Sequence, residues 1–312
     1  MRISLFGAVF CTGMPYFCRS LLVDRLQQGE ETDLLGMRSI GQGLVGLAAL
    51  VGLFAVAASA ADSRLQPMET SDAGRGWEAV GRLDVNGEGF CTGSLIAPDL
   101  VLTAAHCLYD ARSGARIKPQ TIEFLAGWRN GRASAYRTVA RAVVHPDYIF
   151  DGEVSTDRVR KDIALLQLQR PIRNTTVIPF QTDNRPRKGT DVGVVSYAHD
   201  RSEAPSIQEL CAVMAKQEGV LIMSCDVDFG SSGAPVFSFE GGKPRIVSVV
   251  SAKAEVEGRR VSLGAALTEE LQILRAQLTS ARIGSRMPEG VGRVQVGGAR
   301  TTGGAKFIRP GG

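Results

Sequence analysis

The chain has few aromatic residues and little net charge. Aromatic side chains make up 6% of its 312 residues, whereas glycine occurs 36 times. This composition favours a turn-rich β protein over a helical bundle. The formal net charge is only +4, and the basic excess lies in residues 282–312. The rest of the chain is close to neutral, which argues against nucleic acid or another polyanion as a partner.

Long hydrophobic runs are also scarce, and the clearest one lies near the N-terminus. Residues 44–58 are all apolar or glycine, with Arg38 before them and Ala58-Ser59-Ala60 at their end. A basic start, a short apolar core and a small-x-small ending are typical of a secretory signal peptide. The sequence therefore predicts a signal peptide at residues 37–60, cleaved after Ala60.

The position of this run leaves two alternatives open. Either Met37 is the true start and residues 1–36 are an over-extended N-terminus, or residues 40–61 form a signal anchor that stays in the membrane. In both cases the bulk of the protein is expected outside the cytoplasm, secreted or periplasmic.

The C-x-x-C spacing of structural zinc sites is absent, so we expect no metal. Four of the six cysteines follow the apolar run, and an even number in an exported chain predicts two disulfides. Four cysteines allow three connectivities. Nearest-neighbour pairing joins Cys91 to Cys107 and Cys211 to Cys225, which places one bridge beside each of two motifs described below.

Short runs of β-forming residues, separated by turn sequences such as Asn86-Gly87, occupy most of residues 75–266. The predicted strands are residues 90–96, 100–103, 121–125, 136–144, 163–168, 191–195 and 245–250. Many short strands in succession favour a β-sandwich or barrels.

The end of the chain differs from this pattern. A single helix is predicted at residues 267–280, because leucines recur on one face and two glutamates occupy the first turn. The leucines are Leu267, Leu271, Leu274 and Leu278. The Gly/Arg-rich residues 282–312 that follow are predicted to be a disordered tail.

Three motifs supply the side chains that acyl transfer needs. Ser232 lies in the glycine-flanked turn 229–235, where a raised hydroxyl has amide N–H groups beside it. His106 follows a predicted strand, next to Cys107. Asp162 stands at the mouth of a strongly apolar strand, where a half-buried carboxylate can accept a hydrogen bond from an imidazole. Together the three could form a nucleophile, a base and the group that orients the base.

In this order the motifs resemble those of the chymotrypsin/trypsin-like serine peptidases, in particular the bacterial members that include glutamyl endopeptidases. The resemblance runs from about Trp77 to Leu278. It rests on four segments: Thr103-Ala104-Ala105-His106-Cys107, Val144-His145-Pro146-Asp147-Tyr148, Asp162-Ile163-Ala164-Leu165-Leu166 and Gly230-Ser231-Ser232-Gly233-Ala234-Pro235.

The resemblance implies an all-β fold of two packed six-stranded antiparallel β-barrels with a C-terminal helix. The peptidase domain would span residues 61–281, with barrel one at about 75–180 and barrel two at about 181–266.

The resemblance also implies roles for the motif residues. Ser232 would be the nucleophile, His106 the general base and Asp162 the residue that orients the imidazole, with the amides of Gly230 and Ser232 as the oxyanion hole. The expected function is that of a secreted or periplasmic serine endopeptidase that acts through an acyl-enzyme intermediate, without a cofactor. Its partners would be protein or peptide substrates, and a membrane only if residues 40–61 remain as an anchor. We expect a monomer. The alternative is a catalytically inactive binding or scaffold protein with the same fold.

Substrate preference follows from the same comparison. Counted back from the nucleophile, Asp226 falls where trypsin-like members carry the aspartate that binds Arg or Lys. Ser248 and Ser251 would lie on the opposite wall of that pocket.

The sequence departs from the family pattern at a residue that is involved in zymogen activation. Ser231 stands where zymogen-activated members carry an aspartate that pairs with a newly freed N-terminal amine. No Ile-Val-Gly-Gly start occurs between Ala61 and Trp77. We therefore expect no trypsin-type activation switch.

Overall fold

The computed structural model describes residues 64–150, 154–183, 186–267 and 269–284, all within one compact unit of the chain. The predicted signal segment 37–60, the preceding residues 1–36 and residues 285–312 of the predicted tail lie outside the described residues. Within the described part, no helix is long and apolar enough to span a membrane.

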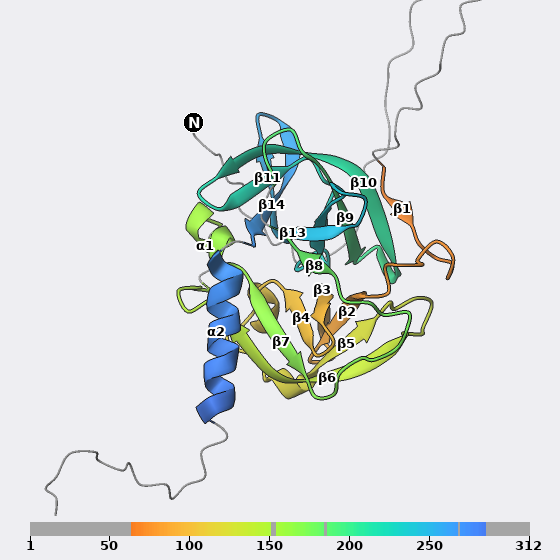
Figure 1. Ribbon diagram of the computed structural model, residues 1–312. Coiled ribbons are helices and arrows are strands. Elements are labelled where there is room, and N and C mark those ends of the chain that lie inside the picture. Colours follow the sequence, from red (N-terminus) through yellow and green to blue (C-terminus); the bar gives the residue numbers. More distant parts are fainter. Residues whose placement is uncertain (1–63, 151–153, 184–185, 268, 285–312) are drawn as a thin grey trace, which may run out of the picture. The chain divides into compact units, whose positions relative to one another are not determined.

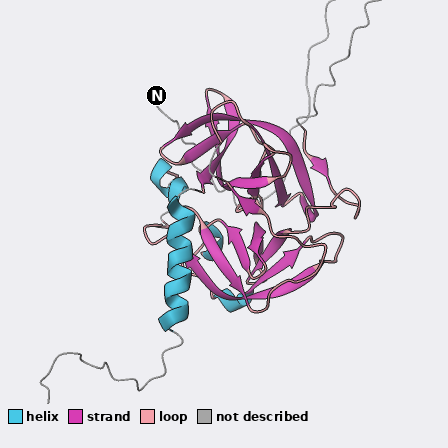
Figure 2. Ribbon diagram, in the orientation of Figure 1, coloured by secondary structure: helices cyan, strands magenta, loops and turns pink. Residues whose placement is uncertain are grey.

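Fourteen strands, two α-helices and two short 3₁₀ helices make up the described part of the chain (Figures 1 and 2). The first half contains β1 (Gln66–Pro67), β2 (Val80–Val85), β3 (Gly89–Ala97), β4 (Leu100–Thr103), η1 (His106–Leu108), η2 (Pro119–Thr121), β5 (Ile122–Ala126), β6 (Ala135–Val144), α1 (Thr156–Lys161) and β7 (Ala164–Leu168). The second half contains β8 (Gln181–Thr182), β9 (Asp191–Ala198), β10 (Arg201–Gln217), β11 (Val220–Met223), β12 (Pro235–Ser238), β13 (Arg245–Val256), β14 (Arg259–Ala266) and α2 (Glu269–Gly284).

The first barrel is closed by six antiparallel strands in the order β2-β3-β4-β7-β6-β5. Its strands are rich in β-branched and aliphatic residues, which suit a pleated and largely buried surface. Their inward side chains, such as Leu83, Leu102, Phe124 and Leu165, are almost completely buried. Closure leaves no free sheet edge in this barrel.

The second barrel is formed by β9, β10, β11, β14, β13 and β12, and it closes because β12 and β10 both pair with β9. Strand β1 adds to β10, and the short β8 pairs in parallel with β13. The predicted fold of two six-stranded antiparallel barrels is confirmed.

Helix α2 runs alongside β6 and β7 of the first barrel (Figure 1). The predicted apolar face is confirmed, because Leu271, Leu274 and Leu278 are buried in the same core as the barrel strands. The helix begins two residues later than predicted and ends at Gly284, inside the segment predicted as a tail. Oε2 of Glu270 lies 3.1 Å from Nε2 of the buried His145, and this contact links the first turn of the helix to the end of β6.

Both disulfides have the predicted pairing. Cys91–Cys107 joins β3 to the turn after β4, and Cys211–Cys225 joins β10 to the segment after β11. Each therefore holds a strand of its barrel against a loop that carries a predicted site residue.

Candidate active site

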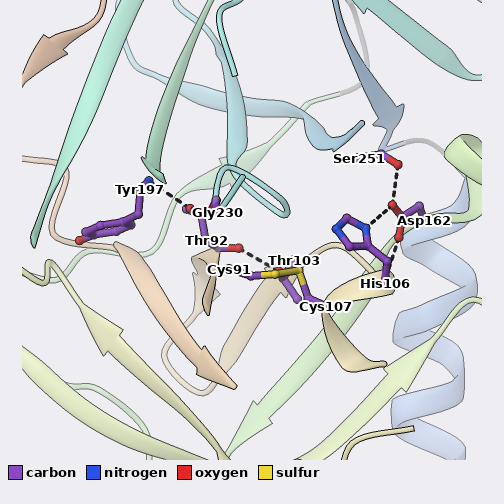
Figure 3. Close-up of a disulfide and its surroundings, with 9 residues drawn as sticks. All are labelled: Cys91, Thr92, Thr103, His106, Cys107, Asp162, Tyr197, Gly230 and Ser251. Atoms are coloured by element: carbon purple, nitrogen blue, oxygen red, sulfur yellow. Dashed lines mark hydrogen bonds and ion pairs between the residues drawn. A yellow bond between two sulfur atoms is a disulfide. The ribbon is translucent and has the colours of Figure 1, made fainter. Parts of the chain in front are cut away.

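His106 and Asp162 meet because of strand pairing in the first barrel. The last residue of β4, Thr103, pairs with the first residue of β7, Ala164. His106 follows β4 and Asp162 precedes β7, so both side chains come to the same end of the barrel. The carboxylate of Asp162 accepts two hydrogen bonds from His106, one from Nδ1 at 2.7 Å and one from the backbone N–H at 2.8 Å (Figure 3).

Asp162 receives a third hydrogen bond from the second barrel. Ser251 Oγ on β13 donates to Asp162 Oδ2 at 2.5 Å. Burial raises the pKa of Asp162, but the electrostatic interaction and hydrogen bonds with His106 and the hydrogen bond from Ser251 outweigh it and hold the pKa below its ordinary value. The carboxylate is thus ionised at neutral pH although its side chain is only 3% exposed.

This geometry determines which nitrogen of His106 can act as a base. Asp162 is ionised and accepts a hydrogen bond from Nδ1, so that nitrogen carries the proton. The other nitrogen, Nε2, keeps its lone pair. His106 is 22% exposed, so this lone pair is accessible from the site.

The loop of Ser232 is held against the first barrel by backbone contacts. The N–H of Thr92 on β3 donates to the carbonyl oxygen of Ser232 at 2.9 Å. Thr92 Oγ1 donates to the carbonyl oxygen of Gly230 at 2.8 Å; both of these residues are drawn in Figure 3. Thr92 directly follows Cys91, and the disulfide partner Cys107 directly follows His106. The Cys91–Cys107 disulfide therefore links the segment that holds the Ser232 loop to the segment that carries His106.

Gly233 brings the serine loop still closer to the histidine. Its φ is +78°, and a Cβ there would lie 2.1 Å from Thr103 Oγ1 and 2.9 Å from the Ala104 nitrogen. Since Thr103 and Ala104 lead into His106, only glycine permits this approach of the two loops.

We expect Gly233→Ala to destabilise the protein by about 3 kcal/mol, because the methyl group would clash with backbone and the positive φ disfavours alanine. Urea unfolding measures this change. Gly241→Ala is the matched control, since Gly241 has a φ of +83° but no atom within 4 Å of the added Cβ. Equal losses from both variants would show that close packing at Gly233 is unimportant.

The peptide between Phe229 and Gly230 belongs to the segment that the sequence predicts as an oxyanion hole. The carbonyl oxygen of Phe229 accepts a hydrogen bond from His199 N–H at 2.8 Å. In a planar trans peptide the N–H points away from the C=O, so the Gly230 N–H points in the opposite direction. Within the described residues, neither Gly230 N–H nor Ser232 N–H has an acceptor. Both donors are therefore available to a ligand.

Ser231 lies beneath this loop, completely buried. Its hydroxyl contacts Ser196 Oγ and the Tyr197 carbonyl oxygen, both at 3.2 Å, and Arg201 Nη2 lies 3.4 Å away. Arg201 Nη2 also donates to Ser196 Oγ at 3.0 Å. A hydroxyl network and a guanidinium of the same chain thus support the loop from inside the second barrel.

Within the described residues, Ser232 Oγ makes no hydrogen bond to the pair formed by His106 and Asp162. Among the described residues, no hydrogen bond joins it to His106 or to any other group. The side chain is partly exposed. Catalytic hydrogen bonds are often long in the free enzyme and shorten when substrate binds.

The other predicted site residues lie in different surroundings. Ser251 Oγ donates to Asp162, whereas Ser248 is completely buried and its Oγ donates to the carbonyl oxygen of Ala265 in the neighbouring strand. Asp226 is exposed, and its backbone N–H donates to Gln208.

Three residues near the site were not predicted from the sequence, namely Thr92, Arg201 and Lys253. Thr92 is adjacent to a predicted disulfide cysteine, which was the one local signal available. Arg201 and Lys253 carry no motif.

One group of potential metal ligands occurs among the described residues, formed by Cys91, His106 and Cys107. Both sulfur atoms are joined in a disulfide, so neither is available as a thiolate ligand.

Comparison with known proteins agrees with this geometry. The model of the Trypsin family matches residues 69–264. Glutamyl endopeptidase of Bacillus licheniformis is 28% identical over 150 residues, which are 48% of this chain and 45% of that protein. The suppressor of tumorigenicity 14 protein homolog of Bos taurus is 35% identical over 126 residues, 37% of this chain and 14% of that protein. The chain thus spans less than half the length of these curated relatives.

A solved structure described as Glu endopeptidase in complex with MPD superimposes with a TM-score of 0.58 at 18% identity. The match covers 70% of this chain and 99% of that chain, and at this identity it supports the fold alone.

Proposed function

Because the chain belongs to the trypsin family of serine peptidases, we propose that it is a secreted or periplasmic endopeptidase that cleaves peptide bonds through a Ser-His-Asp triad. The observation that carries the proposal is the ionised Asp162, which fixes the tautomer of His106, beside a loop with two unpaired N–H donors. The two disulfides and the predicted signal segment support a location outside the cytoplasm.

In the proposed reaction, Ser232 Oγ attacks the peptide carbonyl carbon while His106 Nε2 takes the hydroxyl proton. The N–H groups of Gly230 and Ser232 hold the resulting oxyanion. His106 then gives its proton to the leaving amine, the C–N bond breaks, and an ester to Ser232 remains. Water hydrolyses this ester by the same proton transfers and restores the free serine.

Digestion of a denatured protein mixture tests this function. The wild-type protein should generate new peptide N-termini, detected by mass spectrometry, and the Ser232→Ala variant should not. If the correctly folded wild type, with both disulfides formed, generates none, the protein is the inactive binding protein that the sequence left as the alternative.

Activity is expected to be independent of the N-terminal residue, because Ser231 is held by Ser196 and Arg201 rather than by a freed amine. Forms that begin at Ala61, at Ser63 or with a foreign Gly-Ser sequence should agree within about twofold in kcat, since an intact oxyanion hole is a large contribution to the rate. A large gain in kcat for one specific N-terminus would show that a trypsin-type switch exists.

Two substrate classes are compatible with the proposal. The name of the bacterial relative, glutamyl endopeptidase, suggests an acidic residue before the scissile bond. The position of Asp226 suggests a basic one.

A further inference from the structure

Strand β13 has a free edge beside the catalytic residues. Its pairing with β12 ends at Val249, whereas its pairing with β14 continues to Val256. Among the described strands, none pairs with the other edge of residues 251–256. An extended peptide can add to such an edge, and Ser251 at its beginning contacts the catalytic Asp162.

Lys253 lies on this free edge and reaches the loop of the nucleophile. Its ammonium group donates a hydrogen bond to Asp228 Oδ1 at 2.8 Å and lies 4.3 Å from the ring centroid of Phe229. Phe229 directly precedes Gly230, one of the oxyanion-hole residues. A peptide along the edge, with its scissile carbonyl at Ser232, therefore places the preceding side chain between β13 and this loop, next to Lys253.

The charges around Lys253 leave it able to bind a second carboxylate. Asp228 is its ion-pair partner, but both side chains are about half exposed, at 52% and 56%, and exposed pairs of this kind contribute little. The pKa of the Asp228 carboxyl group is lowered mainly by its hydrogen bond with Lys253. The positive charge of Arg201 makes a smaller contribution in the same direction. Arg201 itself pairs with Asp200 at 3.1 Å, so Lys253 is the cation in direct contact with Asp228.

Phe229 adds an apolar surface at the same place. Its side chain is 73% exposed, although large apolar side chains are usually buried. The ring face holds the Lys253 ammonium by a cation–π contact. The exposed remainder of the ring offers contact to the methylene groups of a glutamate side chain.

We propose, on the basis of the proposed peptidase function, that Lys253 determines specificity by binding a carboxylate side chain on the substrate residue before the scissile bond. The substrate carboxylate replaces or shares the place of Asp228 on the ammonium group. The preferred substrates are peptides and proteins with glutamate at this position. Asp226 makes the opposite prediction of a basic side chain, so the two residues can be tested against each other.

The test uses four peptide substrates that differ only in the residue before the scissile bond, which is Glu, Gln, Ala or Lys. The wild type should hydrolyse the Glu peptide with a kcat/KM about tenfold or more above that of the Gln peptide, as for a hydrogen bond to a charged group. In Lys253→Met the ratio of kcat/KM for the Glu peptide to that for the Gln peptide should fall to about one. Lys253→Glu should favour the Lys peptide.

Lys243→Met is the control, because Lys243 is an exposed lysine in the turn before β13 and should keep the preference for Glu. An unchanged ratio of Glu to Gln in Lys253→Met would overturn the proposal. So would a wild-type preference for Lys that disappears in Asp226→Asn. If Glu is disfavoured in the wild type but the Ala peptide is cleaved, the assignment of Lys253 fails and the peptidase function stands. If none of the four is cleaved, the peptidase function itself fails.

Discussion

Replacement of Ser232 by alanine is expected to lower kcat by about 10⁶-fold, the loss found when the nucleophile of an unrelated serine peptidase is removed. The stability of the fold should hardly change, because Ser232 Oγ makes no hydrogen bond within the described residues and is partly exposed. Hydrolysis of a reporter peptide gives kcat, and urea unfolding gives the stability.

A matched control is Ser280→Ala, since Ser280 is exposed on helix α2 and should leave kcat unchanged. The double variant Ser232→Ala/Asp162→Asn should be no slower than Ser232→Ala alone, because the triad residues act as a unit. A loss of only about tenfold for Ser232→Ala, far below what removal of a nucleophile costs, would mean that another group attacks the substrate.

The second large effect is expected for Asp162→Asn, which should lower kcat by about 10⁴-fold, as the same change does in a related enzyme. An asparagine amide donates where the carboxylate accepts, so it favours the tautomer of His106 in which Nε2 carries the proton. That tautomer cannot take the proton of Ser232. Kinetics across the neutral pH range measure the loss.

Asp157→Asn provides the control for this prediction. Asp157 is an exposed carboxylate on the neighbouring α1 and pairs only with Arg160 and Lys161 among the described residues, so its loss should not affect kcat. If Asp157→Asn inactivated the protein and Asp162→Asn did not, the assignment of the orienting carboxylate would be wrong.

The lowered pKa of Asp162 also predicts a pH dependence of stability. A carboxyl group with a lower pKa in the folded state stabilises the fold above its unfolded pKa of about 3.9, and this contribution is lost as the pH falls through the folded value. Wild type and Asp162→Asn should therefore differ in urea unfolding at pH 7 and converge at strongly acidic pH. A difference that does not change with pH would show that Asp162 is not ionised in the fold.

The barrels were predictable because the motif segments occur in a characteristic order and most strands of the first barrel are apolar. Strand β10 (Arg201–Gln217) was not predicted. Its polar and charged residues and Pro205 obscure the alternation of apolar and polar residues that is typical of a strand. Its position depends instead on backbone pairing with β9 and β11. Strand β13 likewise extends beyond the predicted residue 250, through Lys253 and Glu255, because β14 pairs with it to Val256.

The candidate site also has one part that the sequence predicted and one part that it did not. His106, Asp162 and Ser232 each lie in a recognisable local motif, so the sequence sufficed to single them out. The contacts that support them join distant residues. Thr92 and Gly230 are 138 positions apart, and Ser251 and Asp162 are 89 apart. No local pattern encodes such pairs, because they depend on how the two barrels close and pack.

The most direct measurement is covalent labelling of the disulfide-bonded protein with an organophosphonate that reacts with activated serines. The wild type should take up the label, and mass spectrometry should locate it on Ser232, with none in the Ser232→Ala variant. Absence of label from the folded wild type, or a label that persists after Ser232→Ala, would contradict the assignment of a working triad.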